Sequence, residues 1–206
     1  MRKSLSCRWT IVVVVLALLL VDQVVKVLVK TNMTLGEAIP VFGDWFFIRF
    51  VENDGAAYGI KLAEGYGGKM ALSLIRIVLV GFISYYIHVL VKKGAPKGVI
   101  AGFVLILVGA LGNIIDCMFY GVFFTESTFR SVAHFVCGGG YSSFLHGYVV
   151  DMLHFPIINT TYPEWVPFWG GSEFVFFSPV FNIADAYISV GFAYLLLFHY
   201  KYFGHR

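Results

Sequence analysis

Charged residues are scarce in this sequence. They make up 13% of the 206 residues, whereas a soluble domain has about 25%. Hydrophobic residues make up 59%. This composition argues against a water-soluble globular fold, and we expect an integral membrane protein that forms a single domain over residues 1–206.

Other absences exclude further classes of protein. The only cysteines are Cys7, Cys117 and Cys137, too few for a disulfide framework. No basic patch alternates with aromatic residues, so we expect no nucleic-acid partner. No small-x-small cleavage site follows the first apolar run, and we therefore expect an uncleaved first span rather than a removed secretory signal.

What the sequence does contain is long apolar runs. About 20 apolar residues are needed to cross a bilayer as a helix. Four stretches meet this length and predict four transmembrane helices: Trp9–Val29, Met70–Val91, Gly98–Tyr120 and Val175–Phe198. The expected fold is an all-α membrane protein with two long connections, about 31–69 and 121–174.

The distribution of charge predicts the orientation of these helices. Three segments are basic and contain no Asp or Glu: the N-terminal arm, the short connection between the second and third spans, and the C-terminal tail. The positive-inside rule places all three in the cytoplasm and both long connections outside. The basic residues concerned are Arg2, Lys3, Arg8, Lys92, Lys93, Lys97, Lys201 and Arg206.

The first outer connection has the pattern of a β-hairpin. Ala38–Phe42 and Trp45–Glu52 are rich in aromatic and β-branched residues, and Gly43 and Asp44 separate them. Alternate apolar residues in the second run form one apolar face. We expect that face to lie on the bilayer surface or the helices; an ordinary outer loop with aromatic anchors is the competing interpretation.

Acidic residues inside or beside the spans are the main functional signal. A carboxylate at the centre of a membrane helix costs roughly 2.5–3.5 kcal/mol, so Asp185 inside Val175–Phe198 predicts a functional site. Asn182 and Asp185 share one helical face at i,i+3 spacing, and Asn113 and Asp116 repeat this spacing in the third span.

Asp151, in the second outer connection, is a further acid near the outer surface. Two carboxylates near one water molecule are typical of aspartyl-type hydrolysis, in which the pair shares one proton. The spacing alone leaves open which two of Asp116, Asp151 and Asp185 pair. Asp22 and Lys26 lie at i,i+4, and we interpret them as a structural ion pair.

Zinc binding and proton-coupled transport are the two alternative functions for these polar residues. His134, His146 and His154 share an outer connection with Asp151 and could bind zinc, but their spacing is irregular and no His-Glu-x-x-His motif is present. A proton-coupled transporter could also use acids within the membrane. Four short spans without matching broken helices are a poor pathway for transport. We expect no metal and no cofactor.

Five blocks together resemble the lipoprotein signal peptidase family (signal peptidase II), membrane aspartyl peptidases of bacteria. They occur in the family's order and cover most of the chain. The blocks are Asp22–Lys26, Val51–Gly59, Gly109–Asp116, Val149–Met152 and Phe181–Asp185.

The resemblance implies roles for individual residues. Asp151 and Asp185 would be the catalytic pair. Asn53, Gly55, Asn113 and Asn182 would bind the substrate, whereas Asp22, Lys26 and Asp116 would be structural. The family also has an outer β-cradle, which agrees with the expected hairpin.

The same resemblance implies a substrate and a location. The substrate would be a diacylglyceryl-modified prolipoprotein, cut just before its lipidated cysteine, with membrane lipid as the other partner. The protein would lie in the bacterial cytoplasmic (inner) membrane as a monomer, with its active site near the outer face. The rival interpretation is a non-enzymatic membrane protein, such as a pseudo-peptidase or a lipoprotein-binding factor.

The sequence departs from the family pattern at two places. The family usually has Arg directly after the third-helix Asp, where this chain has Cys117; Arg76 and Arg130 are candidates to supply the missing charge. Residues 122–148 are inserted before the Asp151 block and could form a lid, an interfacial helix or a partner contact.

Overall fold

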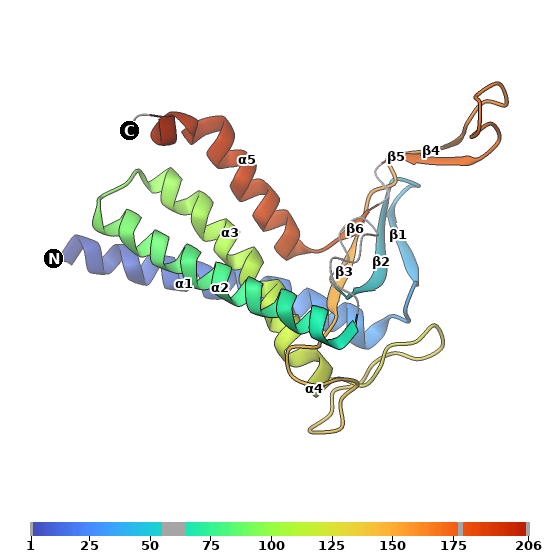
Figure 1. The fold of residues 1–206 in the computed structure, drawn as a ribbon, viewed down its shortest axis with the longest axis horizontal. Coiled ribbons are helices and arrows are strands. Elements are labelled where there is room, and N and C mark those ends of the chain that lie inside the picture. The colour runs from blue at the N-terminus through green and yellow to red at the C-terminus, as the bar shows by residue number, and fades with distance from the viewer. Residues whose placement is uncertain (1, 55–64, 177–178, 205–206) are drawn as a thin grey trace.

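Four long helices dominate the architecture (Figure 1). The computed structural model describes residues 2–54, 65–176 and 179–204. Each of the four helices is long and apolar enough to cross a membrane, as the sequence predicts. They are α1 (Arg2–Asn32), α2 (Gly65–Lys92), α3 (Lys97–Ile115) and α5 (Ile183–Gly204).

The third helix changes its winding at its outer end. It continues beyond α3 through a π-helical turn, η1 (Asp116–Tyr120), and a short α4 (Gly121–Phe123). A π-helical turn is rare and is frequently found at functional sites. The turn begins at Asp116, one of the three candidate acids.

The expected start of the fourth span at Val175 is wrong. Val175 lies in a strand, and the strand β6 (Val180–Phe181) precedes the helix, which begins at Ile183. Residues 180 and 181 pair with a neighbouring strand and are unavailable to the helix. Asp185 therefore lies in the first turn of α5, at the end of the span rather than within it.

A four-stranded antiparallel sheet lies beyond one end of the helices (Figure 1). Its strand order is β1-β2-β3-β6. The hairpin expected between residues 38 and 52 is present as β1 (Ala38–Phe42) and β2 (Phe46–Asn53). The remaining strands, β3 (Val149–His154) and β6, come from the second long connection.

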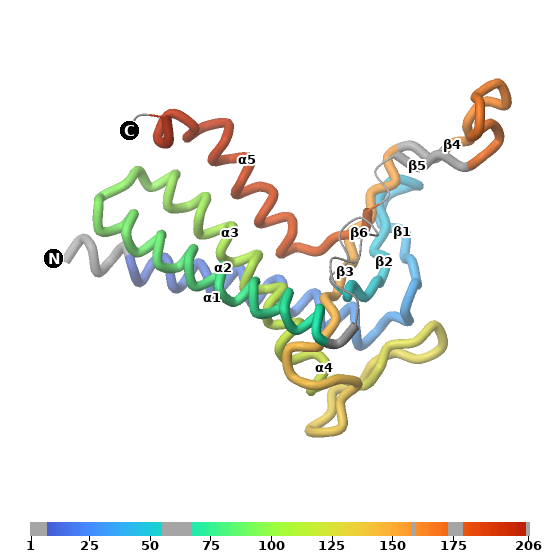
Figure 2. Tube along the Cα trace, in the orientation of Figure 1, coloured from blue at the N-terminus to red at the C-terminus, as the bar shows by residue number. Residues whose placement is uncertain are grey.

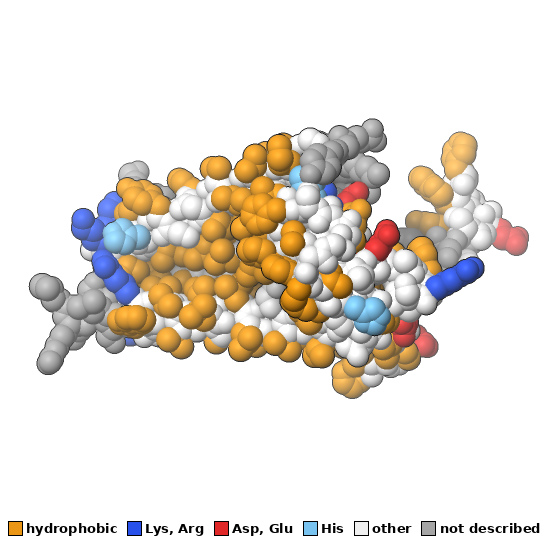
Figure 3. All heavy atoms as spheres, turned by 90° about the horizontal axis from the view of Figure 1, so that it is seen from below, with side chains coloured by type: hydrophobic (Ala, Val, Ile, Leu, Met, Phe, Trp, Pro, Cys, Tyr) orange, Lys and Arg blue, Asp and Glu red, His pale blue; other side chains and the backbone are white. Residues whose placement is uncertain are grey.

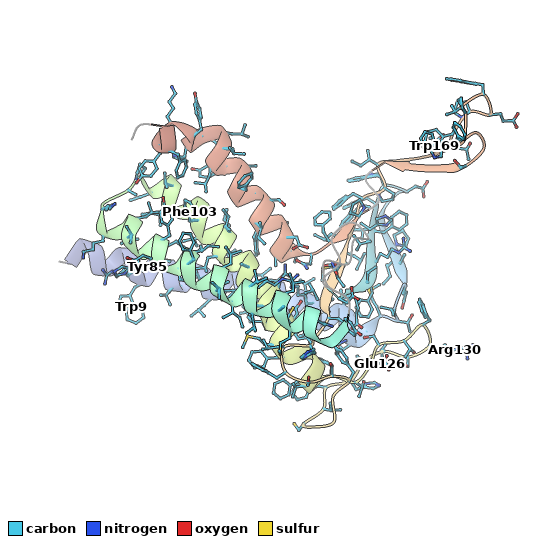
Figure 4. All side chains as sticks on the ribbon, in the orientation of Figure 1. Trp9, Tyr85, Phe103, Glu126, Arg130 and Trp169 are labelled. Carbon is cyan, nitrogen blue, oxygen red and sulfur yellow. The ribbon has the colours of Figure 1, made fainter. Side chains whose placement is uncertain are left out.

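A second, two-stranded sheet projects away from the helices (Figure 2). It pairs β4 (Ile158–Thr161) with β5 (Glu173–Phe176), and its tip carries the exposed Trp169 (Figure 4). The expectation of an all-α protein with one small β-element is thus too narrow. The second connection contributes four of the six strands in the described residues.

The inserted segment 122–148 begins within α4 and continues as an irregular, partly exposed loop. It contains no helix between residues 124 and 148, which corrects the suggestion of an interfacial helix. Its backbone is bound to the rest of the protein at Leu35, whose N–H donates to Thr128 O (2.9 Å), and at Lys30, whose O accepts from Ala133 N (3.3 Å).

Small residues allow α3 and α5 to pack closely. A Cβ atom at Gly109 would lie 2.2 Å from the carbonyl oxygen of Ala184, and one at Gly102 would lie 2.5 Å from Leu195. Membrane helices commonly associate through such small residues because dispersion contacts replace the hydrophobic drive. The start of α5, and with it Asp185, is thereby held against α3.

The visible acidic side chains gather at one end of the molecule. In Figure 3 the helices present a broad hydrophobic surface, with a group of Lys and Arg side chains at one end; the acidic side chains lie at the other end, where Lys or Arg side chains are also present. The apolar surface between the two ends is what a helix bundle in hydrocarbon requires.

Candidate functional site

The candidate site lies where the sheet meets the ends of the helices. Asp151 on β3 lies opposite Val51 of β2, and Asn53 ends β2 opposite Val149. On the other edge of β3, Leu153 pairs with Phe181, the residue directly before Asn182. Strand pairing thus brings three distant parts of the chain to one place.

The Asn182–Asp185 spacing is a reciprocal cap of the α5 N-terminus. Asn182 Oδ1 accepts a hydrogen bond from Asp185 N (2.9 Å), and Asp185 Oδ2 accepts one from Asn182 N (3.4 Å). This is the geometry of a capping box. The cap satisfies two of the N–H groups at the start of α5 and fixes the position of the Asp185 side chain.

Asparagine amides connect the two outer acids. Asn182 Nδ2 donates to Asp151 Oδ1 (2.7 Å) and to Asn113 Oδ1 (3.1 Å). Asn113 Nδ2 in turn donates to Asp185 Oδ1 (2.8 Å). Asn53 Nδ2 completes the set by donating to Asp151 Oδ2 (3.2 Å). These five side chains, all chosen from the sequence, form one connected group.

The surroundings of Asp151 raise the pKa of its carboxyl group. Its side chain is buried, with 2% of the residue exposed. Burial raises the pKa of the Asp151 carboxyl to about 7 from its ordinary value of 3.8, and the nearby Asp185 adds to the rise. Hydrogen bonds from Asn53 and Asn182 oppose it. Near neutral pH, Asp151 therefore exchanges its proton readily.

Asp116 has a different environment from the other two acids. It is fully buried, and its Oδ2 lies 2.8 Å from Lys26 Nζ and 3.2 Å from Val150 N. Lys26 Nζ also lies 3.2 Å from Asp22 Oδ2 and donates to Asn113 Oδ1 (3.0 Å). The predicted pair of Asp22 and Lys26 is present, and Asp116 joins it.

Asp22 also contributes to the position of α5. Its Oδ1 accepts a hydrogen bond from Ala184 N (3.0 Å), one of the free N–H groups at the start of that helix. Gly112 makes this approach possible, because a Cβ there would lie 2.6 Å from Asp22 Oδ2. The Asp22 cluster therefore fixes the helix end that carries Asp185.

Gln23 also belongs to the cluster of Asp22, Lys26 and Asp116, and it was not among the predicted site residues. Its Nε2 donates to Asp22 Oδ2 (3.1 Å), Asp116 Oδ1 (3.0 Å) and Gly112 O (3.2 Å). Tyr120 OH donates to its Oε1 (3.2 Å). A polar residue beside Asp22 in an apolar span was the signal that could have found it.

A second missed group binds the insert to the site. Lys30 is fully buried, forms an ion pair with Glu52 and donates to Ser127 Oγ (3.0 Å). Glu52 precedes Asn53 on β2, so the pair anchors the strand that contacts Asp151. The spacing of Asp22, Lys26 and Lys30, four residues apart on one helical face, was a visible signal.

The remaining expectations concern Gly55, cavities and metals. Gly55 lies outside the described residues. A cavity of about 380 Å³ opens between α3 and α5 and is lined by apolar side chains such as Phe103 and Leu195, away from the acids. Within the described ranges, no three His, Cys, Asp or Glu side chains are grouped as metal ligands would be.

Comparisons with known proteins show that the chain belongs to the signal peptidase II family. Residues 14–201 match a family described as Signal peptidase (SPase) II. A lipoprotein signal peptidase of Porphyromonas gingivalis is 50% identical over 184 residues, which cover 89% of this chain and 79% of that protein. One from Amoebophilus asiaticus is 35% identical over 192 residues, covering 92% of this chain and 77% of that protein.

The fold has a counterpart among solved structures. A bacterial membrane enzyme solved at 2.3 Å superposes with a TM-score of 0.64, covering 96% of this chain and 91% of that one, at 23% identity. At this identity the likeness concerns the fold alone.

Proposed function

Because the chain belongs to the signal peptidase II family, we propose that it is a lipoprotein signal peptidase, an aspartic endopeptidase that cleaves signal peptides from diacylglyceryl-modified prolipoproteins. The observation that carries the mechanism is the joining of Asp151 and Asp185 through the amides of Asn113 and Asn182. The non-enzymatic alternative has no observation in its favour.

Asp151 and Asp185 form the catalytic pair in this proposal. The high pKa of Asp151 supports one proton between them near neutral pH. The competing choice of Asp116 is disfavoured because it forms a fully buried ion pair with Lys26. By contrast, among the described residues Asp151 and Asp185 accept hydrogen bonds from neutral amides only. A carboxylate in such an ion pair as that of Asp116 is suited to a structural role.

The reaction follows from that division of charge. The ionised carboxylate takes a proton from a water molecule as the water oxygen attacks the scissile carbonyl carbon. The protonated carboxyl donates a hydrogen bond to the carbonyl oxygen. When the C–N bond breaks, a proton passes to the leaving amine, which becomes the free amino group of the lipidated cysteine.

The asparagines hold both reactants. Asn182 and Asn113 orient the two carboxylates, and Asn53 orients Asp151 from the opposite side. When a substrate enters, these amides can exchange a contact with a carboxylate for one with a peptide group. Gly55 would add close approach of a backbone, as the family resemblance implies.

The membrane orientation follows from charge. We place both termini in the cytoplasm and the sheet outside, since the N-terminal arm, the connection between α2 and α3 and the C-terminal tail are basic and lack acids, and the visible acidic side chains lie at the opposite end (Figure 3). Asp185, in the first turn of α5, then lies at the outer membrane edge. A substrate with two acyl chains can reach this level by lateral movement in the bilayer.

The test uses purified protein in detergent with two matched precursors, one carrying the diacylglyceryl group on its cysteine and one unmodified. We expect cleavage of the lipidated precursor alone, with mass spectrometry placing the cut directly before the cysteine. Turnover in the presence of EDTA should be unchanged. A folded protein that cleaves neither precursor would contradict the proposal.

A further inference from the structure

Arg76 is a cation inside a membrane-spanning helix and has no carboxylate partner among the described residues. It lies on α2, about 14 Å along the helix from Gly67 at 1.5 Å per residue. Its Nη1 donates a hydrogen bond to Cys117 Sγ (3.1 Å). Among the described residues, no Asp or Glu lies within ion-pairing distance of this guanidinium.

This arrangement is costly unless the guanidinium has another partner. The side chain stays charged in proteins, and it has five N–H donors, whereas a thiol is only a weak acceptor. Charged residues in a span usually face the bundle interior and mark a binding or transport site. Arg76 is half-buried, so part of its donor set remains accessible.

The face of α2 that carries Arg76 is directed at the site. Ser73, on the same helix, donates to Leu145 O (3.0 Å), and Lys69 lies over the ring of Tyr148, 3.6 Å from its centroid. Tyr148 directly precedes β3, the strand of Asp151. The outer half of α2 thus packs against the segment that leads into the site.

The hydrogen bond from Arg76 to Cys117 also connects α2 to the strand β3, through Asp116. Cys117 follows Asp116, whose Oδ2 accepts from Val150 N (3.2 Å), and Val150 precedes Asp151. Cys117 itself is the second residue of the π-helical turn η1 and is buried. The guanidinium therefore borders the same structural unit as the proposed catalytic pair.

We propose that Arg76 is a substrate-binding residue whose guanidinium donates hydrogen bonds to carbonyl oxygens of the lipidated precursor. The inference rests on the proposed function, because that precursor presents peptide and ester carbonyls at this depth. It also accounts for Cys117, where the family usually has Arg: the charge comes from α2 instead of α3. Arg130 is excluded, since it lies at the far end of the insert (Figure 4).

The first test separates binding from folding. Arg76→Gln should raise KM for the lipidated precursor roughly tenfold to a hundredfold, the scale of one charge-assisted hydrogen bond, with kcat changed much less. Lys92→Gln is the matched control, because it removes an exposed cation from the cytoplasmic end of the same helix. Thermal unfolding in the same detergent reports the folded fraction of each variant.

The second test moves the charge between helices. Arg76→Leu should bind the precursor poorly, and adding Cys117→Arg should restore KM to within about threefold of wild type, since that side chain starts where the Arg76 guanidinium now ends. A purely structural link between α2 and α3 would not recover in this way, because the Arg–thiol bond is absent from the double variant.

The source of the carbonyl is tested with two synthetic lipopeptides that differ only in ester or ether linkage of the acyl chains. An increase in KM for Arg76→Gln on both lipopeptides indicates a peptide carbonyl, and an increase on the ester alone indicates an ester carbonyl of the lipid.

The inference and the proposed function are overturned by separate results. If folded Arg76→Gln has an unchanged KM while the wild type is active, the inference is wrong and the proposed function stands. Should Arg76→Gln not fold, failure of Cys117→Arg to rescue Arg76→Leu would overturn the inference. An inactive wild type would instead refute the proposed function.

Discussion

Two stretches of this protein share one pattern, Asn-x-x-Asp, and use it for different purposes. At Asn182–Asp185 the pattern starts a helix, and the two residues cap its free N–H groups. At Asn113–Asp116 the pattern lies inside a continuous helical segment, where the N–H groups already have partners. Position relative to the helix end, not spacing, separates the two.

The consequences for the acids are opposite. Asp116 lies about 10 Å from the end of its helical segment at Phe123, fully buried beside Lys26. Asp185 is at the helix end, half-buried, and faces Asn113 and the strand of Asp151. In the proposed mechanism the first acid holds helices together, and the second takes part in the chemistry.

Asp151→Asn should have the largest effect. An amide has the shape of the carboxyl but cannot share its proton with Asp185, so we expect cleavage to fall about a thousandfold or more. The fold should persist, because Asn has the volume of Asp and its one amide oxygen can still accept the hydrogen bond from Asn182. Asp54→Asn, which changes an exposed acid beyond the end of β2, is the matched control. Equal activity of the two variants per folded molecule would refute the role of Asp151.

Lys26→Met should have the second largest effect, on stability rather than chemistry. It leaves Asp22 and Asp116 buried without a cation, and breaking a buried pair by removing one partner costs about 3–5 kcal/mol. Thermal unfolding in detergent measures the loss, with Lys92→Met as the control at an exposed position on α2. An unchanged unfolding temperature would mean that the cluster is not structural.

Gly109→Ala should separate the two Asn-x-x-Asp segments slightly. The added Cβ would lie 2.2 Å from the carbonyl oxygen of Ala184, a backbone atom that cannot rotate away. We expect a loss of about 1–3 kcal/mol and lower activity, since α5 carries Asp185. Gly81→Ala on α2 is the control, because its Cβ would meet nothing within 4 Å. Equal unfolding temperatures would contradict close packing of α3 on α5.

The pH dependence should give the smallest effect near neutrality. With a pKa of about 7, Asp151 is half deprotonated at pH 7, so turnover should be about half its value at pH 5.5 and fall roughly tenfold per unit above pH 8. If turnover falls to half its maximum only above pH 9, the proposal that Asp151 and Asp185 share one proton is contradicted.

Folding stability should follow the same proton. The folded pKa of Asp151, about 7, lies above its ordinary value of 3.8, so its contribution to folding stability is complete below about pH 3.8 and is lost as pH rises through about 7. The unfolding temperature should therefore fall as pH rises from about 4 to about 7 and then level off. Asp151→Asn should remove that part of the slope, and an identical slope in both proteins would show that another group is responsible.

Much of this arrangement could be predicted from the sequence. Apolar runs predicted the four helices, because hydrocarbon demands length and composition that few soluble segments have. The turn at Gly43 and alternating aromatics predicted the β1–β2 hairpin. The ion pair of Asp22 with Lys26 followed from i,i+4 spacing.

What could not be predicted depends on contacts between distant segments. The start of α5 was placed eight residues too early, at Val175 instead of Ile183, because apolar strand residues and apolar helix residues have the same composition. The pairing of β6 with β3 and the cap at Asn182 decide the boundary. The addition of Asp116 to the Lys26 cluster likewise needed the packing of α1 on α3.

The most direct test compares Asp185→Asn with Asp116→Asn on one lipidated precursor, with cleavage measured per folded molecule. Our account expects Asp185→Asn to lose about a thousandfold or more while keeping its fold, and Asp116→Asn to unfold more easily yet stay within about tenfold of wild-type turnover. The reverse result, an active Asp185→Asn beside a folded but inactive Asp116→Asn, would contradict it.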